Sequence, residues 1–210
     1  MELFTYFRSS AAYRVRIALN YKQIPYQAIP VNLLQGEHKG EAYREINPQG
    51  LVPALCLEDR RLITQSPAIL EWLEENFPEP ALLPRDTYER GVVRSWSNII
   101  ACDIHPIDNL RVLNYLTGEL GITDDQKQAW YQHWIRLGFD ALEPQIQAGP
   151  YCFGAQLTLA DVYLVPQVYN ALRFKLNMAD YPKILSVYEN CNQLEAFIQA
   201  SPENQPDNPG

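Results

Sequence analysis

The chain has 210 residues, of which 47% are hydrophobic and 20% are charged, the composition of an ordinary globular protein. Its formal net charge is −8 and it contains no basic run, which argues against a protein that binds nucleic acid or a membrane surface. No apolar stretch is long enough to span a bilayer, and the first residues lack the pattern of a signal peptide, so we expect a cytoplasmic protein.

The first 80 residues predict the element order β-α-β-α-β-β-α. A strand over residues 2–7, a helix over 11–22 and a strand over 26–31 form a βαβ unit. A short helix is expected over 41–46, followed by a turn at 47–50 and a hairpin made of 51–57 and 62–64. Ser66 as N-cap, with Pro67 at the first helical position, then begins a helix that ends near residue 77.

The second part of the chain shows helical periodicity only, after a proline-rich linker over residues 77–84. Thr158 and Asp161 match a capping box, for which we expect a structural role. The tail from Ser201 to Gly210 predicts an extended strap or a frayed end. Helices are expected over 87–117, 124–147, 158–172 and 184–199.

Ser9 and Ser10 stand where the first strand gives way to the first helix. Free backbone N–H groups and the positive end of the helix dipole gather at such a point, which favours an anion. A thiolate bound there would stay ionised near neutral pH. The plainer interpretation is that a serine simply caps the helix.

The four cysteines lie far apart and include no C-x-x-C pair, so the spacing suits neither a zinc site nor a redox motif. We therefore expect no metal site, and reduced thiols.

A thioredoxin-like element order without a C-x-x-C pair, joined to an all-helical part, resembles the cytosolic glutathione transferases. Several segments are similar to the zeta class, which includes the maleylacetoacetate isomerases. They are Ser9-Ser10 with Arg14–Leu19, Pro30–Leu34, Asn47–Gly50 with Val52–Leu55, Gln65-Ser66, Asn109–Leu113, Tyr151–Gly154, and Leu164–Val168 with Arg173–Lys175.

The resemblance implies a thioredoxin-like glutathione-binding domain over residues 1–81, an all-helical substrate domain over 87–210, and a homodimer. It also implies the contacts of glutathione, the cofactor. Ser10 would donate a hydrogen bond to the sulfur with help from Ser9, and the Val52 backbone, before a cis-proline, would pair with the cysteinyl part. The remaining implied contacts are Gln65 and Ser66 with the γ-glutamyl carboxylate, His38 with the glycyl end, and His105 and Asn109.

Most of these residues also have a simpler interpretation: Val52-Pro53 as an ordinary trans bond that opens a strand, Gln65 and Ser66 as helix caps, His38 as a solvated loop residue, and His105 as a packed helix residue. The implied substrate is a small dicarboxylate dianion, which arginine recognises with a planar fork. Arg8, Arg111 and Arg173 are the candidates, against the alternative of surface or ion-paired arginines. Arg14 and Arg16 are interpreted mainly as helix-stabilising.

The activity implied is the glutathione-dependent cis–trans isomerisation of maleylacetoacetate to fumarylacetoacetate, a step of tyrosine and phenylalanine catabolism. The thiolate adds to the cis alkene, the bond rotates, and elimination returns glutathione. Arg8, Ser9 and Ser10 would act as the catalytic residues by stabilising the developing negative charge. The family motif commonly reads Ser-Ser-Cys, and this chain has Ala11 instead, so glutathione supplies the sulfur.

Three alternatives remain open on the sequence. Maleylpyruvate is shorter but equally a cis dianion, and the residues do not separate it from maleylacetoacetate. A conjugating or dehalogenating transferase would consume glutathione. A transferase fold kept as a binding or regulatory module would perform no reaction.

Overall fold

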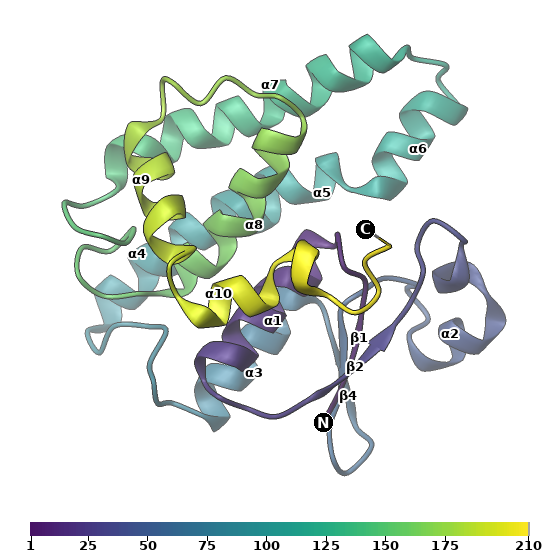
Figure 1. Ribbon diagram of the computed structural model, residues 1–210, viewed down its shortest axis with the longest axis horizontal. Helices are drawn as coiled ribbons and strands as arrows, with labels where there is room; N and C mark the ends of the chain where they lie inside the picture. The colour runs from purple at the N-terminus through teal and green to yellow at the C-terminus, as the bar shows by residue number, and fades with distance from the viewer. Residues whose placement is uncertain (210) are drawn as a thin grey trace. The chain divides into compact units, whose positions relative to one another are not determined.

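The computed structural model describes residues 1–209 and divides the chain into two compact units (Figure 1). The first unit contains Met1–Ala81 together with the chain from Asn192 onward. The second unit contains Leu82–Cys191. The contacts therefore group the C-terminal segment with the N-terminal part of the chain, although it follows the helices of the second unit in sequence.

The first unit is built on a four-stranded sheet with the order β2-β1-β3-β4. β1 pairs in parallel with β2 and antiparallel with β3, which in turn pairs antiparallel with β4. The elements of this unit are β1 (Glu2–Thr5), α1 (Ser10–Tyr21), β2 (Gln27–Pro30), a 3-10 turn η1 (Glu37–Lys39), α2 (Glu41–Ile46), β3 (Ala54–Cys56), β4 (Leu62–Thr64), α3 (Ser66–Asn76), α10 (Glu195–Ala200) and η4 (Pro202–Asn204).

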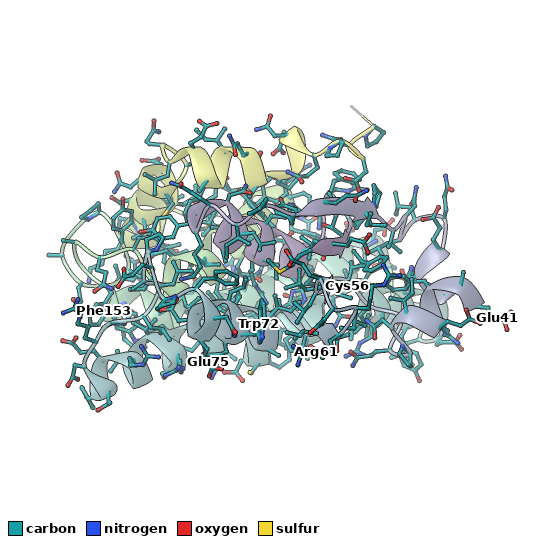
Figure 2. All side chains as sticks on the ribbon, turned by 90° about the horizontal axis from the view of Figure 1, so that it is seen from below. Glu41, Cys56, Arg61, Trp72, Glu75 and Phe153 are labelled. Atoms are coloured by element: carbon teal, nitrogen blue, oxygen red, sulfur yellow. The ribbon has the colours of Figure 1, made fainter. Side chains whose placement is uncertain are left out.

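Alternation along β1 sends its side chains to opposite faces of the sheet. Leu3 and Thr5 are buried on one face, and Thr5 accepts a hydrogen bond from Arg16 of α1 at 3.0 Å. Phe4, on the other face, packs against Tyr43 of α2 with ring centroids 5.8 Å apart. Helices therefore cover both faces: α1, packed against α3 and α10, on one and α2 on the other (Figure 1). Figure 2 shows the side chains of this unit, with Cys56 on β3 and Trp72 on α3 labelled.

The second unit is helical apart from its loops, with α8 at its centre. Most of α8 is buried, and it packs against α4 and α9. The predicted capping box is present at its start, where both carboxylate oxygens of Asp161 accept hydrogen bonds, one of them from Thr158 N at 2.7 Å. The elements are α4 (Thr87–Asn98), a π-helical stretch η2 (Ile99–Ile104), α5 (His105–Asp108), α6 (Leu110–Gly118), α7 (Asp124–Leu142), η3 (Glu143–Gln145), α8 (Leu159–Arg173) and α9 (Pro182–Cys191). The expected fold class, a thioredoxin-like unit with an all-helical unit, is confirmed.

The helix predicted over residues 87–117 is broken in the structure. A π-helical stretch precedes His105, and Pro106 supplies no backbone N–H to continue the ladder of hydrogen bonds. Asn109 then adopts an extended backbone and caps a new helix, α6. The helix predicted over 184–199 is likewise two helices, α9 and α10, which belong to different units.

None of the helices in residues 1–209 is long and apolar enough to cross a membrane. All four cysteines are free thiols, and those at 152 and 191 are buried.

Candidate functional site

Three loops of the first unit meet at one end of its sheet. Phe4, near the end of β1, pairs with Ala54 at the start of β3, and Ala54 pairs with Thr64 at the end of β4. The β1–α1 turn, the segment that leads into β3 and the β4–α3 junction therefore lie at the same edge. This edge carries Ser9-Ser10, Val52-Pro53 and Gln65-Ser66, the three pairs that the sequence analysis singled out.

Ser9 is the N-cap of α1. Its Oγ accepts a hydrogen bond from Ala12 N at 3.2 Å, and its backbone N–H donates to Tyr6 O at 2.9 Å. Ser10 is the first residue of the helix and is buried. The capping interpretation is therefore right for Ser9, whereas Ser10 occupies the first turn, where backbone N–H groups face the helix end. Ala11, also buried, contributes no polar side-chain group there.

Arg8 is half-buried and its guanidinium lies over the Phe7 ring, 4.9 Å from the centroid. Phe7 belongs to a buried cluster with Tyr6, Tyr43 and Val52, so the turn that carries Arg8 is packed against the segment leading into β3. Arg8 therefore stands between the packed Tyr6–Phe7 segment and the Ser9-Ser10 pair.

Val52 is buried and the Val52–Pro53 peptide bond is cis, as the resemblance implied. Tyr43 Oη and Asn47 Nδ2 both donate to Leu51 O, at 2.7 and 2.8 Å, which fixes the backbone just before this bond. Within residues 1–209 no hydrogen bond uses the backbone N–H or C=O of Val52. A backbone N–H and C=O without a protein partner can pair with an extended peptide, as in strand addition.

The β4–α3 junction corrects one detail of the sequence analysis, because the N-cap of α3 is Gln65 rather than Ser66. Gln65 has φ 70°, a left-handed conformation that costs a non-glycine residue about 1–3 kcal/mol. Its side-chain amide donates to Gln49 Oε1. Ser66 is the first helical residue and is buried, and its Oγ accepts from Arg14 Nη1 at 3.4 Å. The strained turn thus exposes the Gln65 side chain beside a helix N-terminus.

His38 lies in the η1 turn and is half-buried. Burial, followed by the charges of Lys39 and Arg44, lowers its pKa, so the imidazole is neutral at pH 7. The His38 carbonyl approaches Gly50, at φ 63°, so closely that a Cβ on Gly50 would lie 2.7 Å from it. The turn over residues 47–50 therefore ties η1 to the loop that carries Val52. Glu41, labelled in Figure 2, begins the helix that follows.

The second unit holds the remaining candidates on α5, α6 and α8. His105 is the first residue of α5 and is half-buried, and Arg111, on α6, is exposed. Asn109 caps α6: its Oδ1 accepts from Val112 N at 3.3 Å and its Nδ2 donates to Pro106 O at 2.9 Å. These bonds give Asn109 a structural role, and its contact with glutathione stays a prediction.

Arg173 is the last residue of α8 and is exposed. Its guanidinium lies 4.8 Å from the Phe174 ring centroid, and Phe174 stacks on Tyr131 of α7 with centroids 3.6 Å apart. Burial raises the pKa of Tyr131, while the charge of Arg173 and its hydrogen bond to the phenol oppose that rise. The stacked rings form a platform that supports the exposed cation.

Asp108, which the sequence analysis did not single out, is 5% exposed. Its two carboxylate oxygens have no hydrogen-bond partner in the described part of the chain, and burial raises its pKa to about 8. Its charge also acts on Tyr131, so the end of α5 and the end of α8 both face that phenol. The local sequence gives no sign of this burial, because Asp108 stands in a polar-looking Asp-Asn pair.

Residues 8–76 match the family model described as glutathione S-transferase, N-terminal domain. A probable maleylacetoacetate isomerase of Vibrio cholerae is 49% identical to this chain, and the match covers 98% of this chain and 97% of the Vibrio protein.

Two solved structures are similar over nearly the whole chain. A holo maleylpyruvate isomerase described as a bacterial zeta-class glutathione S-transferase has a TM-score of 0.96 and 46% identity, covering 99% of both chains. A maleylacetoacetate isomerase of Anaeromyxobacter dehalogenans with bound dicarboxyethyl glutathione and citrate has a TM-score of 0.89 and 41% identity, covering 100% of this chain and 97% of that one. The chain belongs to the zeta class of glutathione transferases, the family that contains the maleylacetoacetate isomerases.

Proposed function

We propose that the protein is a glutathione-dependent cis–trans isomerase that converts maleylacetoacetate to fumarylacetoacetate. The observation that carries this proposal is the meeting of three loops at one end of the sheet, with an unpaired Val52 backbone between the start of α1 and the start of α3. Relatives of 41–49% identity over nearly the full chain bear the same activity in their names or hold a glutathione derivative.

The first unit fits glutathione by the chemistry of its groups. The unpaired Val52 N–H and C=O match the two polar groups of an extended peptide backbone. Ser66 and the N-terminus of α3 suit a carboxylate, and the exposed amide of Gln65 adds a donor. His38, neutral at pH 7, adds a hydrogen-bonding side chain near Gly50. We assign these residues, with His105 and Asn109, to glutathione binding.

When bound, glutathione supplies the thiol that in ionised form adds reversibly to a cis alkene. The task of this chain is to keep that thiol ionised. Ser10 in the first turn of α1 donates to the sulfur, the helix dipole favours negative charge there, and Ser9 keeps the first turn formed by capping it. Ala11 offers no thiol, so this chain has no cysteine of its own at that turn.

Arginines hold the dianionic substrate. Arg8 follows the packed Phe7 and precedes the serine pair, where it also offsets negative charge that develops during the reaction. Arg173 presents its fork from the ring platform, and Arg111 is exposed near the start of α6. A guanidinium stays charged at every working pH and binds a carboxylate through two parallel hydrogen bonds.

Turnover of maleylacetoacetate by the purified protein tests the proposal. The product is coupled to a hydrolase that accepts only the trans isomer, and a reaction without glutathione is the control. We expect product formation only in the presence of glutathione. Equal rates with and without glutathione, or no product in either reaction, would contradict the proposal.

A second candidate is the isomerisation of maleylpyruvate, favoured by the TM-score of 0.96 to a maleylpyruvate isomerase. The two substrates carry the same cis dianionic group and differ in length. Measurement of kcat/KM for both substrates under one buffer condition decides between them, because the preferred substrate gives the larger value.

We further propose that the enzyme works in the cytoplasm as a homodimer, as expected for this class. Light scattering coupled to size-exclusion chromatography measures the mass in solution, and twice the chain mass of 24.1 kDa is the expected value. A mass equal to one chain would contradict the dimer.

A further inference from the structure

The turn between β1 and α1 is held by side chains from distant parts of the first unit. Arg16, fully buried on α1, donates from Nη1 to Tyr6 O at 3.3 Å and from Nη2 to Phe7 O at 3.0 Å. Tyr6 O also accepts from Ser9 N at 2.9 Å. The carbonyls on the inner side of the turn are therefore fixed by one guanidinium.

The amide on the other side of the turn is fixed by the C-terminal strap, which we define as residues 201–209. Phe7 N donates to Asp207 Oδ2 at 2.9 Å, across a separation of 200 residues. Arg16 also reaches this part of the chain, because its Nε donates to Ala200 O at 3.0 Å. Figure 1 shows α10, in yellow, beside α1, with the strap following it along the chain.

The strap has an internal structure of its own, which makes it a defined support rather than a frayed end. It begins with the η4 turn, and Gln205 Nε2 donates to Gln199 O at 2.8 Å and to Ser201 O at 2.9 Å. Asp207 is half-buried. Burial lowers the pKa of Arg16 to about 10, and Asp207 is among the groups that oppose this shift, so the guanidinium stays charged at pH 7.

The consequence for Ser10 follows from chain geometry. Phe7 is 7% exposed, and Asp207 accepts its amide while Arg16 holds its carbonyl. Fixing both backbone groups of one residue restricts the dihedral angles that aim the next residues. Only two residues separate Phe7 from Ser10, so loss of the Asp207 bond frees the turn that presents the hydroxyl.

We propose that Asp207 is a positioning residue: through the Phe7 amide it fixes the β1–α1 turn and thereby aims the Ser10 hydroxyl at the glutathione sulfur. The inference rests on the proposed role of Ser10 in binding glutathione. It assigns a function to the C-terminal strap, as the outer support of the sulfur-binding turn.

Two variants separate the hydrogen bond from the charge. Asp207→Ala removes the acceptor, whereas Asp207→Asn keeps an acceptor oxygen without the charge. Glu203→Ala is the matched control, since it removes an exposed acid from the same strap. For each variant, thiolate absorbance against pH gives the thiol pKa of bound glutathione, and hydrogen exchange measures the protection of the amides of residues 7–10.

We expect Asp207→Ala to raise the thiol pKa by about one unit, the size of one lost hydrogen bond. Amide exchange over residues 7–10 should quicken by about tenfold, in line with the same loss. Asp207→Asn and Glu203→Ala should match the parent protein in both measurements. The inference is overturned if Asp207→Ala lowers only the melting temperature, or if Asp207→Asn is as impaired as Asp207→Ala.

The same experiment distinguishes a failure of the proposed function. If the parent protein does not lower the thiol pKa of glutathione, the proposed role of Ser10 is wrong, and the proposal that Asp207 positions its hydroxyl toward the sulfur fails as well. If the thiol pKa is lowered but no cis–trans product forms, the isomerase proposal fails while the positioning by Asp207 stands.

Discussion

Arg14 of α1 donates a hydrogen bond from Nη1 to the hydroxyl of Ser66, the first residue of α3, at 3.4 Å. Both side chains are buried, so this contact joins the second turn of α1 to the start of α3, the two helices that frame the proposed glutathione site. The Ser66 hydroxyl can accept the hydrogen bond from Arg14 and donate a hydrogen bond of its own to a carboxylate at the same time.

Ser66→Ala should therefore weaken glutathione binding about tenfold, because one hydrogen bond to a charged group is lost. Isothermal titration calorimetry measures the Kd. Ser97→Ala is the control: Ser97 is a buried serine of α4 that donates only to Val93 O, at 2.9 Å. Unchanged affinity in Ser66→Ala would remove Ser66 from the site.

Ser9 and Ser10 should respond differently to replacement. Ser9→Ala removes the N-cap acceptor of Ala12 N and should lower the free energy of unfolding by about 1 kcal/mol. Ser10→Ala should lower kcat by about 100-fold, since it removes the donor to the thiolate. Urea unfolding and steady-state kinetics measure the two effects. If Ser10→Ala kept full kcat, another group would have to stabilise the thiolate.

Arg173→Ala should raise the KM for the dicarboxylate by about 10- to 100-fold, the effect of losing charge-assisted hydrogen bonds, and should leave glutathione affinity unchanged. Arg173→Lys should recover only part of the loss, because an ammonium lacks the planar fork. Arg136→Ala, an exposed arginine on α7, is the control. A KM for the dicarboxylate equal to that of the parent would exclude Arg173 from substrate binding.

Asp108 should make the stability of the protein depend on pH. Burial raises its pKa from 3.8 to about 8 in the folded state. Between these values the folded protein binds more protons than the unfolded chain, so the free energy of unfolding falls as the pH rises. The stability that the protonated Asp108 contributes is fully present below pH 3.8 and is lost as the pH rises to about 8.

Asp108→Asn cannot titrate and should flatten this dependence. Between pH 5 and pH 8 the variant should gain about 4 kcal/mol of unfolding free energy relative to the parent protein, or about 1.4 kcal/mol per pH unit. Urea unfolding at several pH values measures the difference. Parallel curves for the two proteins would show that Asp108 is ionised in the folded state.

The sequence was sufficient where local patterns determine the structure. The order β-α-β-α-β-β-α and the Asp161 capping box are both present, and the cis Val52–Pro53 bond that the resemblance implied is present as well. It was insufficient where local signals competed. Ser66 followed by Pro67 predicted the N-cap one residue too late, because the strained Gln65 occupies that position.

Contacts between distant residues explain the other differences. Nothing near Asp207 indicates that it accepts the amide of Phe7, since the two lie 200 positions apart. Helical periodicity continues through residues 99–109, yet the helix breaks there, because Pro106 and the capping Asn109 outweigh the pattern. The burial of Asp108 depends on the packing of α5 against α7, which its neighbours in sequence do not reveal.

The fate of the glutathione thiol during turnover tests the central claim most directly. Maleylacetoacetate is supplied in about 100-fold excess over glutathione, so that a recycled thiol can convert all of the substrate whereas a consumed thiol can convert only about one hundredth of it. Free thiol is titrated as the trans product accumulates. The account predicts complete conversion of the substrate with the free thiol unchanged. Product formation that stops after one equivalent of glutathione, with loss of the thiol, would contradict it and identify a conjugating transferase instead.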